Sequence, residues 1–117
     1  MTYFSSKIEL PRTSFSTADQ IVRFPVEIPQ NRGSHIVGVK IYEVGHKTNE
    51  FSIGLQSHKE EIQELTYKED WTRLTEQTRT KDIEIEDAAG RKVYFDIQCE
   101  EPFSGNTALH VVFVLSE

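Results

Sequence analysis

The chain between residues 81 and 115 alternates apolar and polar side chains with a period of two, a pattern typical of β-strands. The apolar members are Ile83, Ile85, Val93, Phe95, Ile97, Cys99, Leu109, Val111, Phe113 and Leu115. Because neighbouring side chains of a strand point to opposite sides, each segment directs these residues into a core. A turn at 87–91 separates the first two segments, and its Gly90 can adopt the positive φ of a tight reversal. The pattern predicts strand, turn, strand, loop, strand.

The rest of the chain contains further segments of the same kind. Together they predict eight short strands, at residues 6–10, 20–28, 34–44, 50–57, 71–78, 82–86, 92–99 and 108–115. Residues 58–70 lack the period of two, and we expect a short helical turn there. Eight strands joined by turns favour an all-β, eight-stranded antiparallel β-sandwich, either a single jelly roll or a related Greek-key sandwich. No repeat or linker divides the 117 residues, so we expect one jelly-roll domain spanning 1–117.

Two of the predicted strands carry features that place them in a sheet. Pro25 lies in the middle of strand 20–28 and has no N–H to donate, so this strand is expected at an edge or beside a bulge. Gly38 in strand 34–44 predicts a bulge or the close approach of another backbone. That strand is apolar on both faces, with Val37, Val39 and Ile41 on one side and Ile36, Tyr42 and Val44 on the other. A lone domain rarely exposes such a face, so we expect another subunit to cover it.

The charge balance argues against some partners. The chain has 13 Lys and Arg against 19 Asp and Glu, a formal net charge of -6, whereas binding to phosphate backbones or anionic membranes depends on cationic side chains. We therefore expect no direct nucleic-acid binding. No apolar run of about 18 residues is present for a membrane span, and the first residues lack the apolar region of a signal peptide. The single cysteine, Cys99, falls on a predicted inward face, which is consistent with a reducing compartment and no internal disulfide.

Catalytic and metal-binding patterns are missing from the sequence, and we expect no enzyme activity, no metal and no cofactor. The four histidines never occur as His-x-His, the spacing with which a strand of a cupin presents two ligands to one metal ion. Two Ser-His neighbours, at 34–35 and 57–58, come without any feature that marks a nucleophile. Paired acidic residues such as Glu60 and Glu61 are typical of a solvated surface. A cupin-like enzyme stripped of its usual ligands is a third, weaker alternative.

Aromatic residues suggest a different class of function. Tyr42 and Tyr94 point outward in their predicted strands, and with Trp71 they could form a platform that stacks on a carbohydrate or a peptide. Outward aromatic residues are also enriched where subunits meet. The alternatives are thus a ligand-binding β-sandwich for carbohydrate or protein recognition, without catalysis, and a self-associating subunit.

Residues 82–95, Asp-Ile-Glu-Ile-Glu-Asp-Ala-Ala-Gly-Arg-Lys-Val-Tyr-Phe, resemble the penultimate hairpin of small single-jelly-roll viral capsid proteins of the penton (vertex) or minor capsid type. In those proteins an acidic strand, an Asp-x-x-Gly-Arg turn and a Phe-bearing strand precede the last strand. The segment from Leu109 to Leu115 fits the same plan. The resemblance covers about a third of the chain.

The resemblance implies a structural virion protein that acts by self-association, as a homo-oligomer, and by contacts with other capsid proteins. It would be made in the host cytoplasm and located in the virion; the alternative location is the cytoplasm. Many coat proteins carry a basic N-terminal arm for the genome, whereas Lys7 and Arg12 are the only basic residues among the first 20. Such a subunit would contact proteins and not nucleic acid. Its candidate interface residues are Ile36, Tyr42, Val44 and Tyr94.

Overall fold

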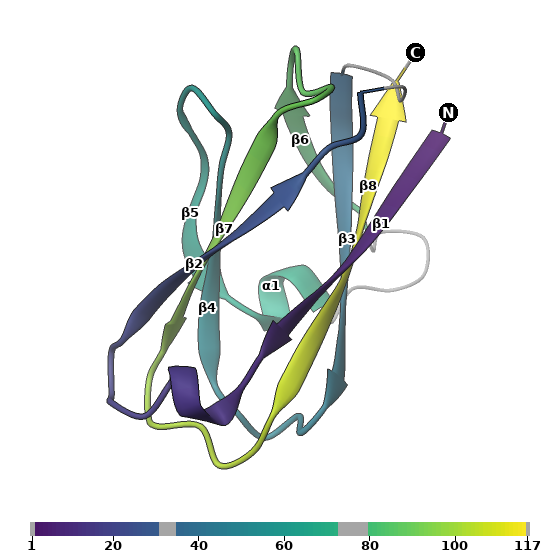
Figure 1. Cartoon of the computed structure of the whole chain (residues 1–117). Helices are drawn as coiled ribbons and strands as arrows, with labels where there is room; N and C mark the ends of the chain where they lie inside the picture. Colours follow the sequence, from purple (N-terminus) through teal and green to yellow (C-terminus); the bar gives the residue numbers. More distant parts are fainter. Residues whose placement is uncertain (1, 31–34, 73–79, 117) are drawn as a thin grey trace.

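The computed structural model describes residues 2–30, 35–72 and 80–116. Within these ranges the elements are β1 (Thr2–Leu10), η1 (Arg12–Ser14), β2 (Ile21–Glu27), β3 (His35–Gly45), β4 (Phe51–Gln56), β5 (Glu61–Tyr67), α1 (Glu69–Thr72), β6 (Lys81–Ile85), β7 (Lys92–Cys99) and β8 (Thr107–Ser116). Strands in the order β1-β8-β3-β6 form one antiparallel sheet, and strands in the order β2-β7-β4-β5 form the other. The two sheets pack face to face as a sandwich (Figure 1).

The order of the strands is that of a jelly roll. Consecutive strands alternate between the sheets, except that β4 and β5 are neighbours, and the last strand β8 lies between β1 and β3. Two Greek keys around one core give this arrangement, so the predicted eight-stranded antiparallel β-sandwich is confirmed. The segment 87–91 links β6 in one sheet to β7 in the other, and is therefore a crossing between sheets and not the turn of a two-stranded hairpin. Its Gly90 has the expected positive φ, 73°.

The core forms from the inward side chains of both sheets. Phe95 and Phe113 are fully buried and their ring centroids lie 6.0 Å apart, which joins the middles of the two sheets. Cys99 is buried as predicted and donates from its Sγ to the backbone carbonyl of Thr17. Pro25 lies on β2, an edge strand, as its missing N–H required.

The helical turn expected within 58–70 occurs only at the end of that range, where α1 begins at Glu69, and the predicted strand 71–78 is wrong where the structure describes it. Residues 61–67 form β5 and not a helical turn, and Trp71 lies in the single turn α1 and not in a strand. The remainder of the predicted strand, 73–78, lies outside the described residues. Pairing of β5 with β4 is irregular at two points, and each irregularity shifts which side chains face inward. Ile62 packs against the core whereas Leu65 is 40% exposed, so their spacing of three does not mark one inward face.

A bulge in β3 corrects the predicted faces of that strand. The pairing of β3 with both neighbours shifts between Ile36 and Gly38, which moves the residues before the shift by one position. Ile36 therefore faces the core with Val39 and Ile41 and is fully buried, whereas Val37 is half-buried. Gly38 marks the bulge as predicted, since a Cβ there would meet the Thr80 side chain at 2.6 Å. The first strand also begins earlier than expected, at Thr2.

Candidate subunit interface

The surface of interest is the solvent side of the β1-β8-β3-β6 sheet, called the outer face below. Its outward side chains are Tyr3, Ser5, Lys7 and Glu9 on β1, Ala108, His110, Val112 and Val114 on β8, and Lys40, Tyr42 and Val44 on β3. The strand register arranges them in rows across the sheet. Tyr42 lies opposite His110, and Val44 lies opposite Ala108.

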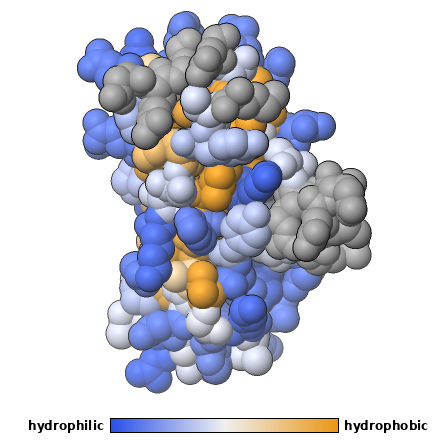
Figure 2. All heavy atoms as spheres, turned by 90° about the vertical axis from the view of Figure 1, so that its right-hand side faces the viewer, coloured by the Kyte–Doolittle hydropathy of each residue, from blue (hydrophilic) through white to orange (hydrophobic). Residues whose placement is uncertain are grey.

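The exposed side chains Tyr42 and Val44 lie near the C-terminal end of β3. Val44 is 48% exposed and Tyr42 is 36% exposed, and the ring centroids of Tyr42 and His110 lie 6.3 Å apart. Farther along the sheet the exposed ring of Tyr3 lies 5.7 Å from Lys40 Nζ. Figure 2 views this side of the molecule and shows separate apolar patches, with hydrophilic residues between and around them.

Two hollows flank the exposed pair of β3. One, of about 260 Å³, is lined by Lys7, Glu9, Val44, Gly45, Asn106, Thr107 and Ala108. The other, also of about 260 Å³, is lined by Tyr42, Glu43, Lys47 and Thr72. The projecting side chains therefore stand between depressions. A partner whose side chains fill these depressions would be complementary in shape to this surface, as the packed cores of interfaces are.

The structure places only two of the four predicted interface residues on one face. Tyr42 and Val44 lie on the outer face as expected. Ile36 is in the core because of the bulge, so it cannot touch a partner. Tyr94 lies on β7, in the other sheet, and points away from the core on the opposite side of the sandwich. The four predicted residues therefore do not form one patch.

Sequence reasoning missed the contribution of β8 to the outer face. Ala108, Val112 and Val114 lie on the outward side of the strand between β1 and β3; Val112 is half-buried, and Ala108 and Val114 are already buried within the single chain. The signal was present, because residues 107–115 are apolar at nearly every position and not only at alternate ones. A strand that is apolar on both sides is covered on both sides or lies under a contact.

The predicted aromatic platform does not exist. Trp71 is 1% exposed and packs edge-on against Phe95, with centroids 6.4 Å apart. Tyr42 and Tyr94 lie on opposite sides of the sandwich, and the Arg23 guanidinium covers the Tyr94 ring at 5.6 Å. These three aromatic side chains cannot stack on one ligand.

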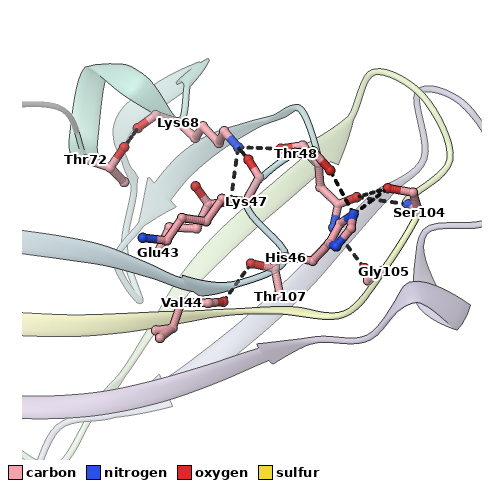
Figure 3. A network of polar contacts seen from close by, with 11 residues as sticks. Glu43, Val44, His46, Lys47, Thr48, Lys68, Thr72, Ser104, Gly105 and Thr107 are labelled. Carbon is pink, nitrogen blue, oxygen red and sulfur yellow. Dashed lines mark hydrogen bonds and ion pairs between the residues drawn. The ribbon is translucent and has the colours of Figure 1, made fainter.

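A buried ion pair supports the outer face from beneath (Figure 3). Lys68 Nζ donates to Glu43 Oε2 at 3.1 Å, to the carbonyl of Lys47 at 2.9 Å and to the carbonyl of Asn49. The exposed fractions of the Lys68 and Glu43 side chains are 5% and 9%. All three ammonium protons thus have acceptors, and the pair ties β3 and the β3–β4 loop to the end of β5. Glu43 immediately follows Tyr42 and precedes Val44, so the pair fixes the strand that presents both.

The pKa of Glu43 lies above its ordinary value of 4.5 because burial raises it more than the hydrogen bond from Lys68 lowers it. The folded protein therefore holds this proton more tightly than the unfolded chain does. The stabilising contribution is complete below the unfolded pKa and is lost as the pH rises through the folded one. We expect Glu43→Gln to match the wild type near pH 4 and to gain stability relative to it by pH 7. Urea midpoints at both pH values measure this difference.

Glu60→Gln, at an exposed position, is the matched control. We expect the stability difference between this variant and the wild type to be the same at both pH values. A Glu43→Gln variant that instead loses relative stability as the pH rises would mean that the attraction of Lys68 outweighs burial.

One Ser-His contact was not anticipated. His46 Nε2 lies 2.8 Å from both Ser104 Oγ and Thr48 Oγ1, although Ser104 is 58 residues away in the sequence. Asn49 is buried beside it, donates to the Gly105 carbonyl and accepts from the Ser104 backbone N–H. Among the described residues the imidazole bonds to these two hydroxyls and to no carboxylate. The contact joins the loop after β3 to the loop before β8 (Figure 3).

The histidines on either side of β4 do not lie together. His46 and His58 lie beyond opposite ends of β4. In the described ranges no three His, Cys, Asp or Glu side chains gather in a way that could hold a metal ion. None of the helices in these ranges is long and apolar enough to cross a membrane.

No protein-family model and no curated protein matches this chain. Among solved structures, the acidic stable capsid structure of Helicobacter pylori bacteriophage KHP30 matches it with a TM-score of 0.46 and 14% sequence identity, over 99% of this chain and 90% of that chain. At this TM-score we assign no family, and the function proposed below depends on the residues of the chain itself.

Proposed function

We propose that this protein is a non-enzymatic structural subunit of a virion, a small jelly-roll capsid protein of the vertex or minor type, which self-associates through its outer face. The observation that carries the proposal is the exposed pair Tyr42 and Val44 near the end of β3 on that face, which projects between two hollows. The jelly-roll order of the strands and the resemblance of residues 82–95 to small capsid proteins support the viral context. The subunit resides in the virion.

A subunit contact of standard size would occupy a small part of the surface of this chain. A standard interface buries about 800 Å² on each partner, roughly an eighth of the 6607 Å² that the chain exposes. Tyr42 and Val44 supply an aromatic and an aliphatic side chain, and the charged Lys7 and Glu9 of β1 lie in the same cross-strand rows, so apolar and charged groups adjoin as they do where the core of an interface meets its rim. The partners are further copies and other capsid proteins. Nucleic acid is not among them, because the net charge of -6 repels a phosphate backbone.

Tyr42→Glu and Val44→Glu test the proposed contact. Each would place a charge in an apolar interface and is expected to dissociate the assembly while the domain stays folded, because both side chains already reach solvent in the single chain. Size-exclusion chromatography with light scattering measures the mass, and circular dichroism measures the fold.

Ile21→Glu is the control, because Ile21 is equally exposed but lies on the opposite sheet, on β2. Assembly that survives both outer-face substitutions would remove this face as the interface. A wild-type chain that remains a monomer at high concentration would count against self-association altogether.

A further inference from the structure

Edge strands offer a second kind of contact, because their outer backbone N–H and C=O groups have no partner in the sheet. Three of the four edges in the described sheets carry features that discourage pairing. β2 contains Pro25, β5 is irregular at two points, and β6 has only five residues, with acidic Asp82 and Glu84 pointing outward.

β1 lacks these protections. It pairs with β8 over nine consecutive residues, from Thr2 to Leu10, without a register shift and without proline. In the described part of the chain no strand lies on its other side. Its inward side chains are also incompletely covered: Phe4 stacks on Phe113 with centroids 6.2 Å apart and yet remains half-buried, and Ser6 is half-buried as well. Across the gap between the sheets, Val22 and Phe24 of edge strand β2 are likewise half-buried.

We infer that β1 pairs antiparallel with β1 of a second copy, about a two-fold axis at Ser6, so that two four-stranded sheets become one eight-stranded sheet. This register pairs all nine residues of the strand. The opposed residues are Thr2 with Leu10, Tyr3 with Glu9, Phe4 with Ile8, Ser5 with Lys7, and Ser6 with itself.

In this register the opposed side chains are compatible on both the inward and the outward side of the paired β1 strands. On the inward side, half-buried Phe4 meets Ile8 of the second copy, which extends the apolar contact across the junction. On the outward side, no like charges stand opposite each other, since Lys7 faces a serine and Glu9 faces a tyrosine. The smallest polar side chain of the inward row lies on the axis, where two identical residues must fit together. A closed two-fold contact of this kind is the commonest way in which identical chains pair.

This contact uses the strand edge and not the outer face. A negative result for one contact would therefore not exclude the other. A chain with both contacts can form an extended assembly, because each copy then touches different neighbours through different surfaces.

Disulfide trapping in the full chain tests the register. Opposed residues of antiparallel strands have Cα atoms about 4.5 or 5.5 Å apart, within the span that a disulfide bridges. We expect Ser6→Cys to give a covalent dimer with oxidised glutathione on a non-reducing gel. A mixture of Ser5→Cys and Lys7→Cys chains is expected to cross-link to each other, and each variant alone to do so far less.

The wild-type chain is the baseline, since Cys99 is fully buried, and Ser52→Cys on the interior strand β4 is the positional control. Ser6→Cys that stays monomeric at about 100 µM while folded would overturn the inference, and so would equal cross-linking of Ser52→Cys. Trapping is repeated in the Val44→Glu background. If the Ser6→Cys dimer is still trapped in this background while larger assemblies disappear, the edge contact forms independently of the outer-face contact.

Charge at a single position gives a second readout. Ser5→Glu places a carboxylate opposite Lys7 of the second copy, and Ser5→Lys places an ammonium there. Each junction contains this pair twice, so we expect Ser5→Glu to tighten the dimer and Ser5→Lys to weaken it by roughly two- to tenfold in dissociation constant. Sedimentation velocity measures both. Equal effects of the two substitutions would contradict the register.

Discussion

Replacing Lys68 with methionine is expected to lower the free energy of unfolding by about 3–5 kcal/mol at pH 7. The substitution keeps the length of the side chain but removes the ammonium group that contacts Glu43 and the carbonyls of Lys47 and Asn49. A buried carboxylate and two carbonyl groups then lose their donor. Since a domain of this size is stable by only about 5–15 kcal/mol, the loss is a large part of the total, and urea unfolding followed by tryptophan fluorescence measures it.

Lys59→Met is the matched control, because the Lys59 side chain is 62% exposed and lies 3.8 Å from Asp87 in a surface ion pair. Such pairs contribute about 0–1 kcal/mol. The Lys68 loss is expected to shrink at acid pH, where Glu43 takes up a proton and no longer needs a cation. Equal urea midpoints for the two variants would mean that the buried pair does not hold the β3–β4 loop.

Phe95→Ala is expected to cost about 3–5 kcal/mol, as truncation of a buried aromatic side chain usually does. Phe95 is fully buried on β7 and contacts the rings of Trp71 and Phe113. Removal of its ring leaves a cavity between the two sheets that backbone shifts of paired strands cannot close. Thermal and urea unfolding both report the loss.

Tyr94→Ala provides the comparison within the same strand, because its side chain points outward and contacts the Arg23 guanidinium. We expect it to cost clearly less than Phe95→Ala. A melting temperature of Phe95→Ala equal to that of the wild type would contradict the assigned faces of β7.

The two contacts proposed for this chain lie in different places, and the variants tell them apart. Val44→Glu acts on the solvent side of β3, near the end of that strand, and Ser6→Cys acts on the edge strand β1. Mass measurements report assembly and unfolding measurements report stability, so the two kinds of effect can be separated for each variant.

The sequence by itself determined the fold class and the phase of most strands. Alternation along 92–99 and the apolar residues at every second position from Leu109 to Leu115 are enough to predict that Phe95 and Phe113 are buried, because period two is a local property of the backbone. Pro25 likewise indicates an edge strand through its own missing N–H, and Gly90 indicates a tight reversal through its freedom at positive φ.

Only the tertiary structure decided which strands share a sheet and where the strands are irregular. The bulge at Gly38 moved Ile36 into the core, and the pairing of β5 with β4 is irregular at two points, so β5 lacks the regular period of two that identified the other strands. Tyr94 was separated from Tyr42 because β7 and β3 belong to different sheets. Each of these depends on hydrogen bonds between residues distant in the sequence, and one shifted pair exchanges the two faces of a strand. The outer face and the free edge of β1 are defined by the pairing of strands into two sheets, so the sequence alone could not predict them.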